Sequence, residues 1–419
     1  MLLKKLSFLG LLTPLALAAC ADDAGDPMND EVGTDSDTGM DDVGTMGTDS
    51  TGSTTDTTDA TDTTTDSTDA TDTTDTTDTT DTTDTGEVGD PLPEAPPGEW
   101  LWVEIDGMFC RDGSPAGVGV RYADNTDKLA IFMEGGGACF NFLTCAINPS
   151  NVNPGMFDPG PFSGVFNDAN PDNALMDYNF VYLPYCTGDV FFGSEPNGNV
   201  PGGPQNQMFV GHDNVIAALE RIADTFPNTA DVIALGTSGG GFGAAANYDT
   251  IASYFPNNDV TLIDDSGPLF RDQYLAPCLQ QTFRDVWGVD DSLPADCTEC
   301  FQPDGGGLWN YLPYVAQKYP NATKTIISSE ADGTISTFFG YGSNNCNAVF
   351  PSFPQFSEAL YDLRDNVLTE DTWGTYFKTG TSHTYLADEN AYNTLQVSGV
   401  LLIDWVTDVV NGQPSHVAP

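Results

Sequence analysis

The stretch VIALGTSGGG, residues 232–241, decides how this chain is expected to fold. Its first four residues are apolar, as in a buried strand, and they lead directly into Gly236-Thr237-Ser238-Gly239-Gly240. A G-x-S-x-G sequence between a strand and a helix forms a sharp turn, and its glycines are needed because larger side chains would clash there. We therefore expect a strand, a turn that exposes Ser238, and a helix whose N-terminus faces that serine. A glycine-rich turn without chemistry is the alternative interpretation.

Apolar runs of strand length recur on both sides of this stretch. Amphipathic stretches with helical spacing, at 214–226 and 391–410, alternate with them. Strands and helices in alternation predict a parallel sheet that is covered on both faces. The expected fold class is therefore α/β and α/β-hydrolase-like, with a mostly parallel central sheet and helices on both faces. The apolar runs lie at 129–133, 180–183, 232–235, 260–263 and 325–327.

A run of glycines follows the strand predicted at 129–133, in the sequence EGGGAC of residues 134–139. Esterases of this fold place backbone N–H groups after an early strand, where they bind the oxyanion that develops in the transition state. The amides of Gly136, Gly137 and Gly239 are our candidates for this oxyanion hole. A flexible loop pinned by Cys139 is the alternative interpretation, and it explains the glycines less well.

A serine nucleophile needs a base, and the chain contains three histidines. In this fold the order along the chain is serine, acid, histidine, with the histidine in a loop after the last strand. His383 fits that order and is the predicted base. His212 precedes the nucleophile at the start of a predicted helix, where we expect it to cap or pack. His416 lies in a C-terminal tail that we expect to fray.

The acid that completes the triad is predicted from its position, because 62 acidic residues make abundance uninformative. Asp332 lies in the loop after the strand predicted at 325–327, where the late-strand carboxylate of this fold usually falls. Such a carboxylate holds the imidazole in the right tautomer and stabilises its charged form. Asp264, Asp265 and Glu330 remain alternative candidates for the acid.

Three motifs together resemble those of the pectin acetylesterase family, which includes plant pectin acetylesterases and the Notum carboxylesterases. The family's E-G-G-G-W-C is similar to residues 134–139, its Y-C-D-G to residues 185–188, and its G-x-S-A-G-G to residues 236–241. The resemblance covers the chain from about residue 100 onward. It implies an α/β-hydrolase with a Ser, Asp and His triad, an oxyanion hole in the glycine run, and removal of acyl groups from oxygen.

The departures from these motifs concern the substrate. Ala138 replaces the family's Trp beside the oxyanion hole, Thr187 replaces Asp, and Gly239 replaces Ala. Loss of an aromatic wall should widen or reshape the acyl pocket, which leaves specificity for acetyl groups open. Four aromatic residues are candidates to line a carbohydrate or acyl site, with a place in the core as the alternative: Phe140, Tyr185, Phe191 and Phe192.

These residues predict an extracellular serine ester hydrolase, which removes O-acetyl or other acyl groups from polysaccharide through an acyl-enzyme. Hydrolysis of lipid or polyester esters is one alternative, and a catalytically inactive surface binding module is another. The expected partner is an acylated carbohydrate or another ester substrate. We expect no cofactor and no metal, because a serine hydrolase requires neither.

The first 19 residues have the layout of an export signal, in which two lysines precede an apolar run too short to span a membrane. The run ends in Leu17-Ala18-Ala19-Cys20, which resembles a bacterial lipobox. We expect Cys20 to carry a lipid that attaches the protein to a membrane. The protein would then be an exported bacterial lipoprotein of the cell envelope or cell surface. An ordinary signal peptide cut nearby is the alternative.

Residues 20–95 are expected to form a disordered, Thr/Asp-rich linker, because up to Asp90 they contain 22 acidic residues and no Lys or Arg. The Asp-Thr-Thr repeats between residues 54 and 85 lack the glycine turn of known calcium loops, which argues against calcium binding. Composition becomes glycine-rich and aromatic further on, which predicts one hydrolase domain at 96–419. From residue 91 onward, 40 acidic residues face 10 basic ones. Such a surface repels phosphate, so we expect no nucleic acid partner.

Eight cysteines remain once Cys20 is assigned to the lipid. An even number in an exported chain predicts four disulfides, whose pairing the sequence alone leaves open. Cys297 and Cys300 form a C-x-x-C sequence that could also serve zinc or redox chemistry. No second C-x-x-C and no nearby histidine completes a metal site, so structural disulfides are the favoured interpretation.

Overall fold

The computed structural model of this protein describes residues 89–350 and 353–419. The predicted export signal, Cys20 and nearly all of the predicted linker therefore lie outside the described residues. Within the described part, Leu92 is buried and the Arg221 guanidinium donates to the Asp90 carbonyl at 2.7 Å. The chain thus packs on the domain a few residues before position 96.

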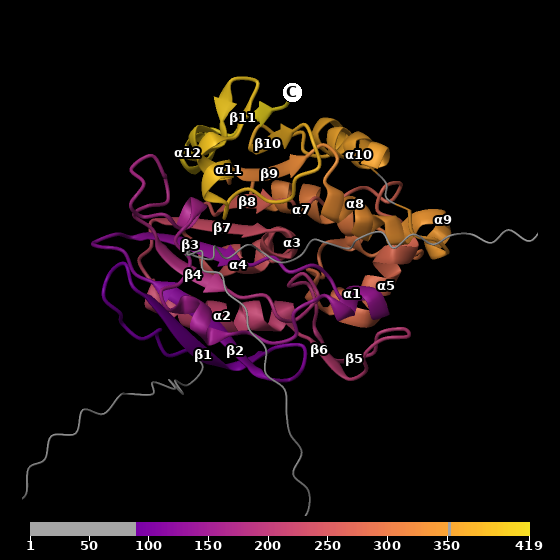
Figure 1. Cartoon of the computed structure of the whole chain (residues 1–419), viewed down its shortest axis with the longest axis horizontal. Helices are drawn as coiled ribbons and strands as arrows, with labels where there is room; N and C mark the ends of the chain where they lie inside the picture. The colour runs from indigo at the N-terminus through magenta and orange to yellow at the C-terminus, as the bar shows by residue number, and fades with distance from the viewer. Residues whose placement is uncertain (1–88, 351–352) are drawn as a thin grey trace, which may run out of the picture. The chain divides into compact units, whose positions relative to one another are not determined.

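A nine-stranded sheet forms the centre of the described domain, in the order β1-β2-β4-β3-β7-β8-β9-β10-β13. The pairs β1·β2 and β2·β4 are antiparallel, and all the others are parallel. Figure 1 shows the sheet running from β1 and β2, in indigo, to β10 near the C-terminus, in yellow-orange. The strands are β1 Trp100–Phe109, β2 Pro115–Arg121, β3 Lys128–Met133, β4 Asn179–Leu183, β7 Asp231–Thr237, β8 Thr261–Asp265, β9 Lys324–Ser329, β10 Trp373–Lys378 and β13 His416–Val417.

Both faces of the sheet are covered. Successive side chains of each central strand point to opposite sides, and those on each side pack into a separate apolar cluster. In β3, Leu129 and Ile131 belong to one apolar cluster, whereas Ala130 and Phe132 belong to the other. Helices α2, α4, α7 and α10 contribute to the first cluster, and α11 and α12 contribute to the second. The α/β class and the mostly parallel sheet that the alternating pattern predicted are confirmed, and all five predicted strands are present.

The helices and short strands that surround the sheet follow the chain order. The α-helices are α1 Phe142–Ala146, α2 Gly211–Thr225, α3 Gly239–Ala246, α4 Tyr248–Tyr254, α5 Pro277–Trp287, α6 Val289–Ser292, α7 Tyr311–Lys318, α8 Gly333–Phe339, α9 Ser343–Cys346, α10 Phe353–Asn366, α11 Glu389–Thr394 and α12 Leu402–Val410. The 3₁₀ helices are η1 Pro154–Phe157, η2 Gly164–Phe166, η3 Thr298–Cys300, η4 Leu308–Asn310 and η5 Gly340–Gly342, and two hairpins pair β5 Glu195–Gly198 with β6 Gln207–Phe209 and β11 Gln396–Val397 with β12 Val400–Leu401. Among these described helices, none is both long enough and apolar enough to cross a membrane.

Two expectations about the C-terminal region were wrong. The stretch 391–410 is not one helical segment, because Ser398 and Gly399 both have positive φ and close the hairpin β11–β12 between α11 and α12. His416 does not lie in a frayed tail. It pairs in β13 with Thr375 of β10, and this edge strand is held because the next residue, Val417, is buried in the second cluster.

Four disulfides are present among the described residues, as the cysteine count predicted, and the structure supplies their pairing. Cys110 pairs with Cys186, Cys139 with Cys145, Cys278 with Cys346, and Cys297 with Cys300. The C-x-x-C sequence is therefore a disulfide. In the described part of the chain no cluster of His, Cys, Asp and Glu side chains could hold a metal ion.

Candidate active site

The turn between β7 and α3 carries Ser238 in a strained conformation. Its φ is 56°, in the left-handed region that residues other than glycine rarely adopt. A Cβ at Gly236 would overlap the Gly240 carbonyl, and a Cβ at Gly240 would overlap the Met133 carbonyl of β3. Both glycines of the motif are therefore required, because strand β3 and the turn pack against each other without room for a side chain. The Ser238 amide donates to the Asp265 carbonyl at 2.7 Å, which fixes the turn to the end of β8.

The structure brings the predicted base and the predicted acid to this serine. His383 Nε2 lies 2.7 Å from Ser238 Oγ, and His383 Nδ1 lies 2.7 Å from Asp332 Oδ2. Both distances are those of hydrogen bonds, and the order serine–imidazole–carboxylate is that of a catalytic triad. The Asp332 side chain is fully buried, whereas His383 is 17% exposed. The imidazole can therefore meet a substrate while the carboxylate remains shielded from water.

Asp332 is held by the start of helix α8 as well as by His383. Its Oδ1 accepts hydrogen bonds from the amides of Thr334 and Ile335, both at 2.9 Å, so Asp332 is the N-cap of the helix. One carboxylate oxygen thus faces the helix and the other faces the imidazole. These hydrogen bonds together fix the direction of the carboxylate.

The three alternative acids accept hydrogen bonds from other groups among the described residues. Asp265 Oδ2 accepts from the amides of Tyr385 and Leu386, at 2.6 and 2.8 Å, and so fastens the segment that follows His383. Burial raises the pKa of Asp265 to about 6. Asp264 is fully buried beneath α3, and burial raises its pKa well above the ordinary value. Glu330 accepts a hydrogen bond from the Tyr361 hydroxyl.

The other two histidines lie away from this constellation. His212 is buried at the start of α2, and its Nδ1 lies 2.7 Å from Asn247 Oδ1. Burial lowers the pKa of this histidine. It packs, as its position at the start of a helix predicted, while His416 belongs to the edge strand β13.

The glycine run passes directly over the serine. A Cβ at Gly135 would lie 2.8 Å from Ser238 Cβ, and a Cβ at Gly136 would overlap the Tyr185 ring. Gly137, Ala138 and Gly239 line one pocket together with Ser238, whereas Gly136 is not among the residues that line it. Two of the three predicted oxyanion residues therefore lie on the pocket wall, and Gly136 does not.

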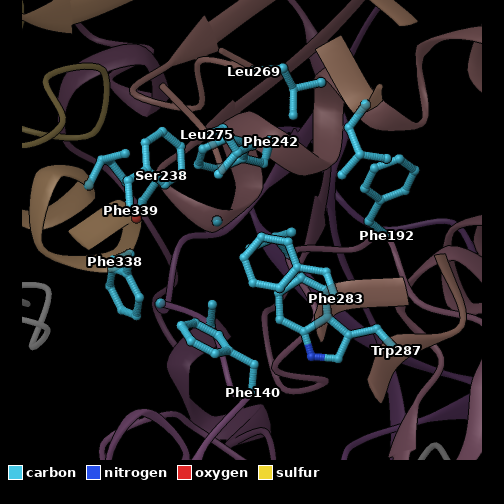
Figure 2. Close-up of a pocket in the computed structure, with 16 residues that line it drawn as sticks. Phe140, Phe192, Ser238, Phe242, Leu269, Leu275, Phe283, Trp287, Phe338 and Phe339 are labelled. Carbon is cyan, nitrogen blue, oxygen red and sulfur yellow. The ribbon is translucent and has the colours of Figure 1, made fainter. Parts of the chain in front are cut away.

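The pocket beside Ser238 has a volume of about 640 Å³, including its open mouth, and an almost entirely apolar surface. In Figure 2 the rings of Phe140, Phe283 and Phe338 approach the same space, with Ser238 and Phe242 on another side of it. Besides these five residues, Gly137, Ala138, Val190, Phe192, Gly239, Leu269, Leu275, Trp287, Leu308, Ile335 and Phe339 line the pocket.

Only part of this wall was foreseen from the sequence. Of the four aromatic candidates, Phe140 and Phe192 line the pocket, whereas Tyr185 and Phe191 are not among its lining residues and pack in the core. The walls supplied by α5 and α8 carry no motif. Their only signal is amphipathic helical spacing, which core residues show as well.

Known proteins resemble this chain in sequence and in fold. Residues 103–334 match the family model described as Pectinacetylesterase. Palmitoleoyl-protein carboxylesterase notum2 of Xenopus laevis is 29% identical over 156 residues, which are 35% of this chain and 30% of the relative. Palmitoleoyl-protein carboxylesterase NOTUM of Drosophila melanogaster is 27% identical over 216 residues, which are 46% of this chain and 32% of the relative. The matched segment thus spans about a third of the length of these curated relatives.

A solved structure shows the same fold. The structure of the Wnt deacylase Notum from Drosophila superposes with a TM-score of 0.58 at 18% sequence identity, covering 76% of this chain and 95% of the Notum chain. At this level of identity the likeness concerns the fold alone. It agrees with the mostly parallel sheet and the helices on both of its faces.

Proposed function

Because this chain belongs to the pectinacetylesterase family, we propose that it is a carboxylic-ester hydrolase with Ser238 as nucleophile, His383 as base and Asp332 as acid. The observation that carries the proposal is the pair of 2.7 Å contacts by which one imidazole joins the serine to the buried carboxylate. Family membership supports carboxylesterase activity, and the geometry supplies residues for it.

The reaction would proceed through an acyl-enzyme. His383 Nε2 removes the proton of Ser238 Oγ as that oxygen attacks the ester carbonyl, and Asp332 stabilises the imidazolium that forms. The backbone amides of Gly137, Ala138 and Gly239 would hold the oxyanion, because these residues share the pocket wall with Ser238. In this proposal Ala138 takes the place of Gly136, which the sequence suggested. His383 then returns the proton to the leaving alcohol, and it activates the water that releases the acyl group.

The pocket supports an acyl chain longer than acetyl as the preferred substrate group. Aromatic and aliphatic side chains surround the space next to Ser238, with Phe140, Phe283 and Phe338 among them. The lining offers hydrocarbon to an acyl chain almost everywhere except at Ser238, and each buried methylene contributes about 0.8 kcal/mol. The names of the Notum relatives describe carboxylesterases of palmitoleoyl-protein, which also carries a long acyl group.

The negative charge of the domain disfavours an ester whose alcohol part is itself negatively charged. From residue 91 onward, 40 acidic residues face 10 basic ones, so the domain repels polyanions such as uronate-rich polysaccharide and anionic lipid surfaces. We therefore favour a neutral acylated carbohydrate or another uncharged ester as the partner. Nucleic acid is disfavoured for the same reason.

The cell envelope or cell surface is the proposed location. Four disulfides in the described domain support an oxidising compartment. The lipobox-like sequence at Cys20 supports attachment of the linker, residues 20–95, to a membrane through a lipid, with the hydrolase domain at 96–419.

The test is turnover of p-nitrophenyl acetate, butyrate and octanoate by the purified protein and by Ser238→Ala. We expect kcat/KM to rise with chain length, and Ser238→Ala to lower it by at least a factor of about 10³. Ser253→Ala is the control, because Ser253 lies at the end of α4 and bonds only locally to the Thr250 carbonyl. A folded protein with no turnover, whose ester binding is the same in Ser238→Ala, would instead identify a binding module.

A further inference from the structure

Two backbone carbonyls in the glycine run are held by side chains. The Asn148 side-chain amide donates to the Gly136 carbonyl at 2.7 Å. The Tyr185 hydroxyl donates to the Gly137 carbonyl at 2.8 Å. Asn148 follows α1 and Tyr185 follows β4, so two separate segments converge on the same short loop. Both side chains are buried.

The planarity of the peptide bond gives these contacts a consequence. In a trans peptide the C=O of one residue and the N–H of the next lie in one plane and point in opposite directions. The group that holds the Gly136 carbonyl therefore also directs the N–H of Gly137. In the same way, the group that holds the Gly137 carbonyl directs the N–H of Ala138.

The directed N–H groups belong to residues on the pocket wall. Gly137 and Ala138 line the pocket beside Ser238, while the Tyr185 ring that contacts Gly136 is not part of that lining. Gly137 has a φ of 82°, and successive amides around a residue in the left-handed region form a concavity that binds anions. The carbonyls of Gly136 and Gly137 thus point toward Asn148 and Tyr185, and the N–H groups of the same two peptide bonds point away from these side chains.

Tyr185 is itself fixed from several directions. Its amide donates to Glu134 Oε2 at 2.8 Å, and its hydroxyl oxygen accepts from the Val190 amide at 2.8 Å. The Phe191 ring lies 5.2 Å from the tyrosine ring. Burial raises the pKa of Tyr185 well above its ordinary value, so the hydroxyl keeps the proton that it donates to Gly137.

Disulfides tie both anchoring segments to the domain. Cys186, next to Tyr185, is bonded to Cys110, and Cys145, three residues before Asn148, is bonded to Cys139 of the glycine run. The Cys139 amide also donates to the Gly188 carbonyl at 2.7 Å. These bonds therefore hold the segments of Tyr185 and Asn148 in place relative to the glycine run.

We propose that Tyr185 and Asn148 are positioning residues that aim the N–H groups of Ala138 and Gly137 at the carbonyl oxygen of an ester bound at Ser238. This inference rests on the proposed esterase function and adds to it two side chains that never touch the substrate. Their effect is felt in the transition state, where negative charge develops on that oxygen. Substrate binding depends mainly on the apolar pocket and should change little.

The test compares Tyr185→Phe with Tyr248→Phe in the full-length protein. Tyr248 is the matched control because it is also buried and its hydroxyl also donates to a backbone carbonyl, that of Val260 at 2.6 Å, but it lies on α4 outside the pocket lining. For p-nitrophenyl octanoate we expect Tyr185→Phe to lower kcat by about 10- to 100-fold with KM within twofold. This loss is smaller than the 10²–10³ that follows removal of a donor itself.

A second measurement distinguishes a positioning role in catalysis from a general effect on the structure. An octyl trifluoromethyl ketone forms a tetrahedral adduct with a serine nucleophile and so places an oxyanion in the hole, whereas 1-octanol occupies only the acyl pocket. Tyr185→Phe should weaken ketone binding by the same factor as kcat/KM and leave octanol binding unchanged. Asn148→Ala should behave in the same way, with Asn179→Ala as the control, because buried Asn179 donates to the Lys128 carbonyl far from the pocket.

The outcomes are distinct. The positioning role is overturned if Tyr185→Phe matches Tyr248→Phe in kcat and in ketone affinity, or if ketone and octanol binding fall together. A wild-type protein that neither turns over the ester nor binds the ketone would overturn the proposed function itself. Melting curves of all four variants identify any that fail to fold, and if Tyr185→Phe is one of these, Asn148→Ala decides the question.

Discussion

Ala138 is a small residue at the point where the glycine run meets the pocket. It is 8% exposed and lines the pocket with Phe140 and Ser238. The related motif carries Trp at this position, so the absence of an indole leaves space next to the nucleophile. At the scale of single residues, Ala138 is a position at which one substitution would fill the pocket next to Ser238.

Ala138→Trp should convert a pocket for longer chains into one for short chains. The indole would occupy space that an octanoyl chain needs, while an acetyl group at Ser238 needs little of it. We expect kcat/KM for p-nitrophenyl octanoate to fall by about 10- to 200-fold, which corresponds to about 1–3 kcal/mol of lost binding, and that for acetate to change by less than fivefold. An unchanged ratio of octanoate to acetate turnover would show that the chain enters elsewhere.

At the scale of elements, helix α8 has two functions. Its N-cap is Asp332, whose carboxylate contacts His383, and the helix itself supplies Ile335, Phe338 and Phe339 to the pocket. The same short helix therefore orients the proposed acid and forms part of the acyl wall. A change at the cap acts on folding and on chemistry through different oxygen atoms.

Substitutions at Asp332 should separate these two functions. Asn caps helices as well as Asp, so Asp332→Asn should keep the unfolding free energy within about 0.5 kcal/mol, whereas Asp332→Ala should lose about 1 kcal/mol more. Both should lower kcat by roughly 10⁴-fold, because neither side chain stabilises the imidazolium. Urea unfolding and ester turnover measure the two effects, and equal stability of the Asn and Ala variants would show that the cap contributes nothing.

The elements also show where sequence reasoning succeeds. Short apolar runs predicted the five central strands, since buried parallel strands have a continuous apolar pattern. The order of serine, acid and histidine along the chain predicted which loops would carry Asp332 and His383. The hairpin within 391–410 was missed, because apolar residues on both sides of Ser398 and Gly399 kept a helical spacing. The pocket walls were missed for a different reason. Helices α5 and α8 approach Ser238 only through tertiary packing, which leaves no local pattern.

At the scale of the whole molecule, the protein combines a large negative charge with buried carboxyl groups. The formal net charge is −50 at pH 7. Burial raises the pKa of Asp189 and of Asp265 from an ordinary value of 3.8 to about 6, and it raises that of Asp264 well above the ordinary value. Where the folded pKa exceeds the unfolded one, the folded state binds more protons, so stability is full below the unfolded pKa and is lost as pH rises through the folded pKa.

The protein should therefore be more stable at pH 5.5 than at pH 7.5. Lys324, whose pKa burial lowers to about 8, changes stability only above that pH, and the lowered pKa values of His212 and His416 oppose the trend below their ordinary value of 6.5. Three carboxyl groups and the falling net charge outweigh these two histidines. We expect Tm to be several degrees higher at pH 5.5, with added salt narrowing the gap by screening repulsion. A Tm that falls from pH 7.5 to pH 5.5 would contradict this.

The strand order also determines how the ends of this domain could be joined to each other or to another protein. The described chain enters the sheet at one edge, in β1, and leaves it at the other, in β13. Nine strands at about 4.8 Å per step separate these edges by roughly 38 Å. A circular permutant would thus need a joining peptide of at least about 11 extended residues. For the same reason, grafting the domain into a surface loop of another protein would force that loop's two ends far apart, whereas fusion through one end would leave the sheet undisturbed.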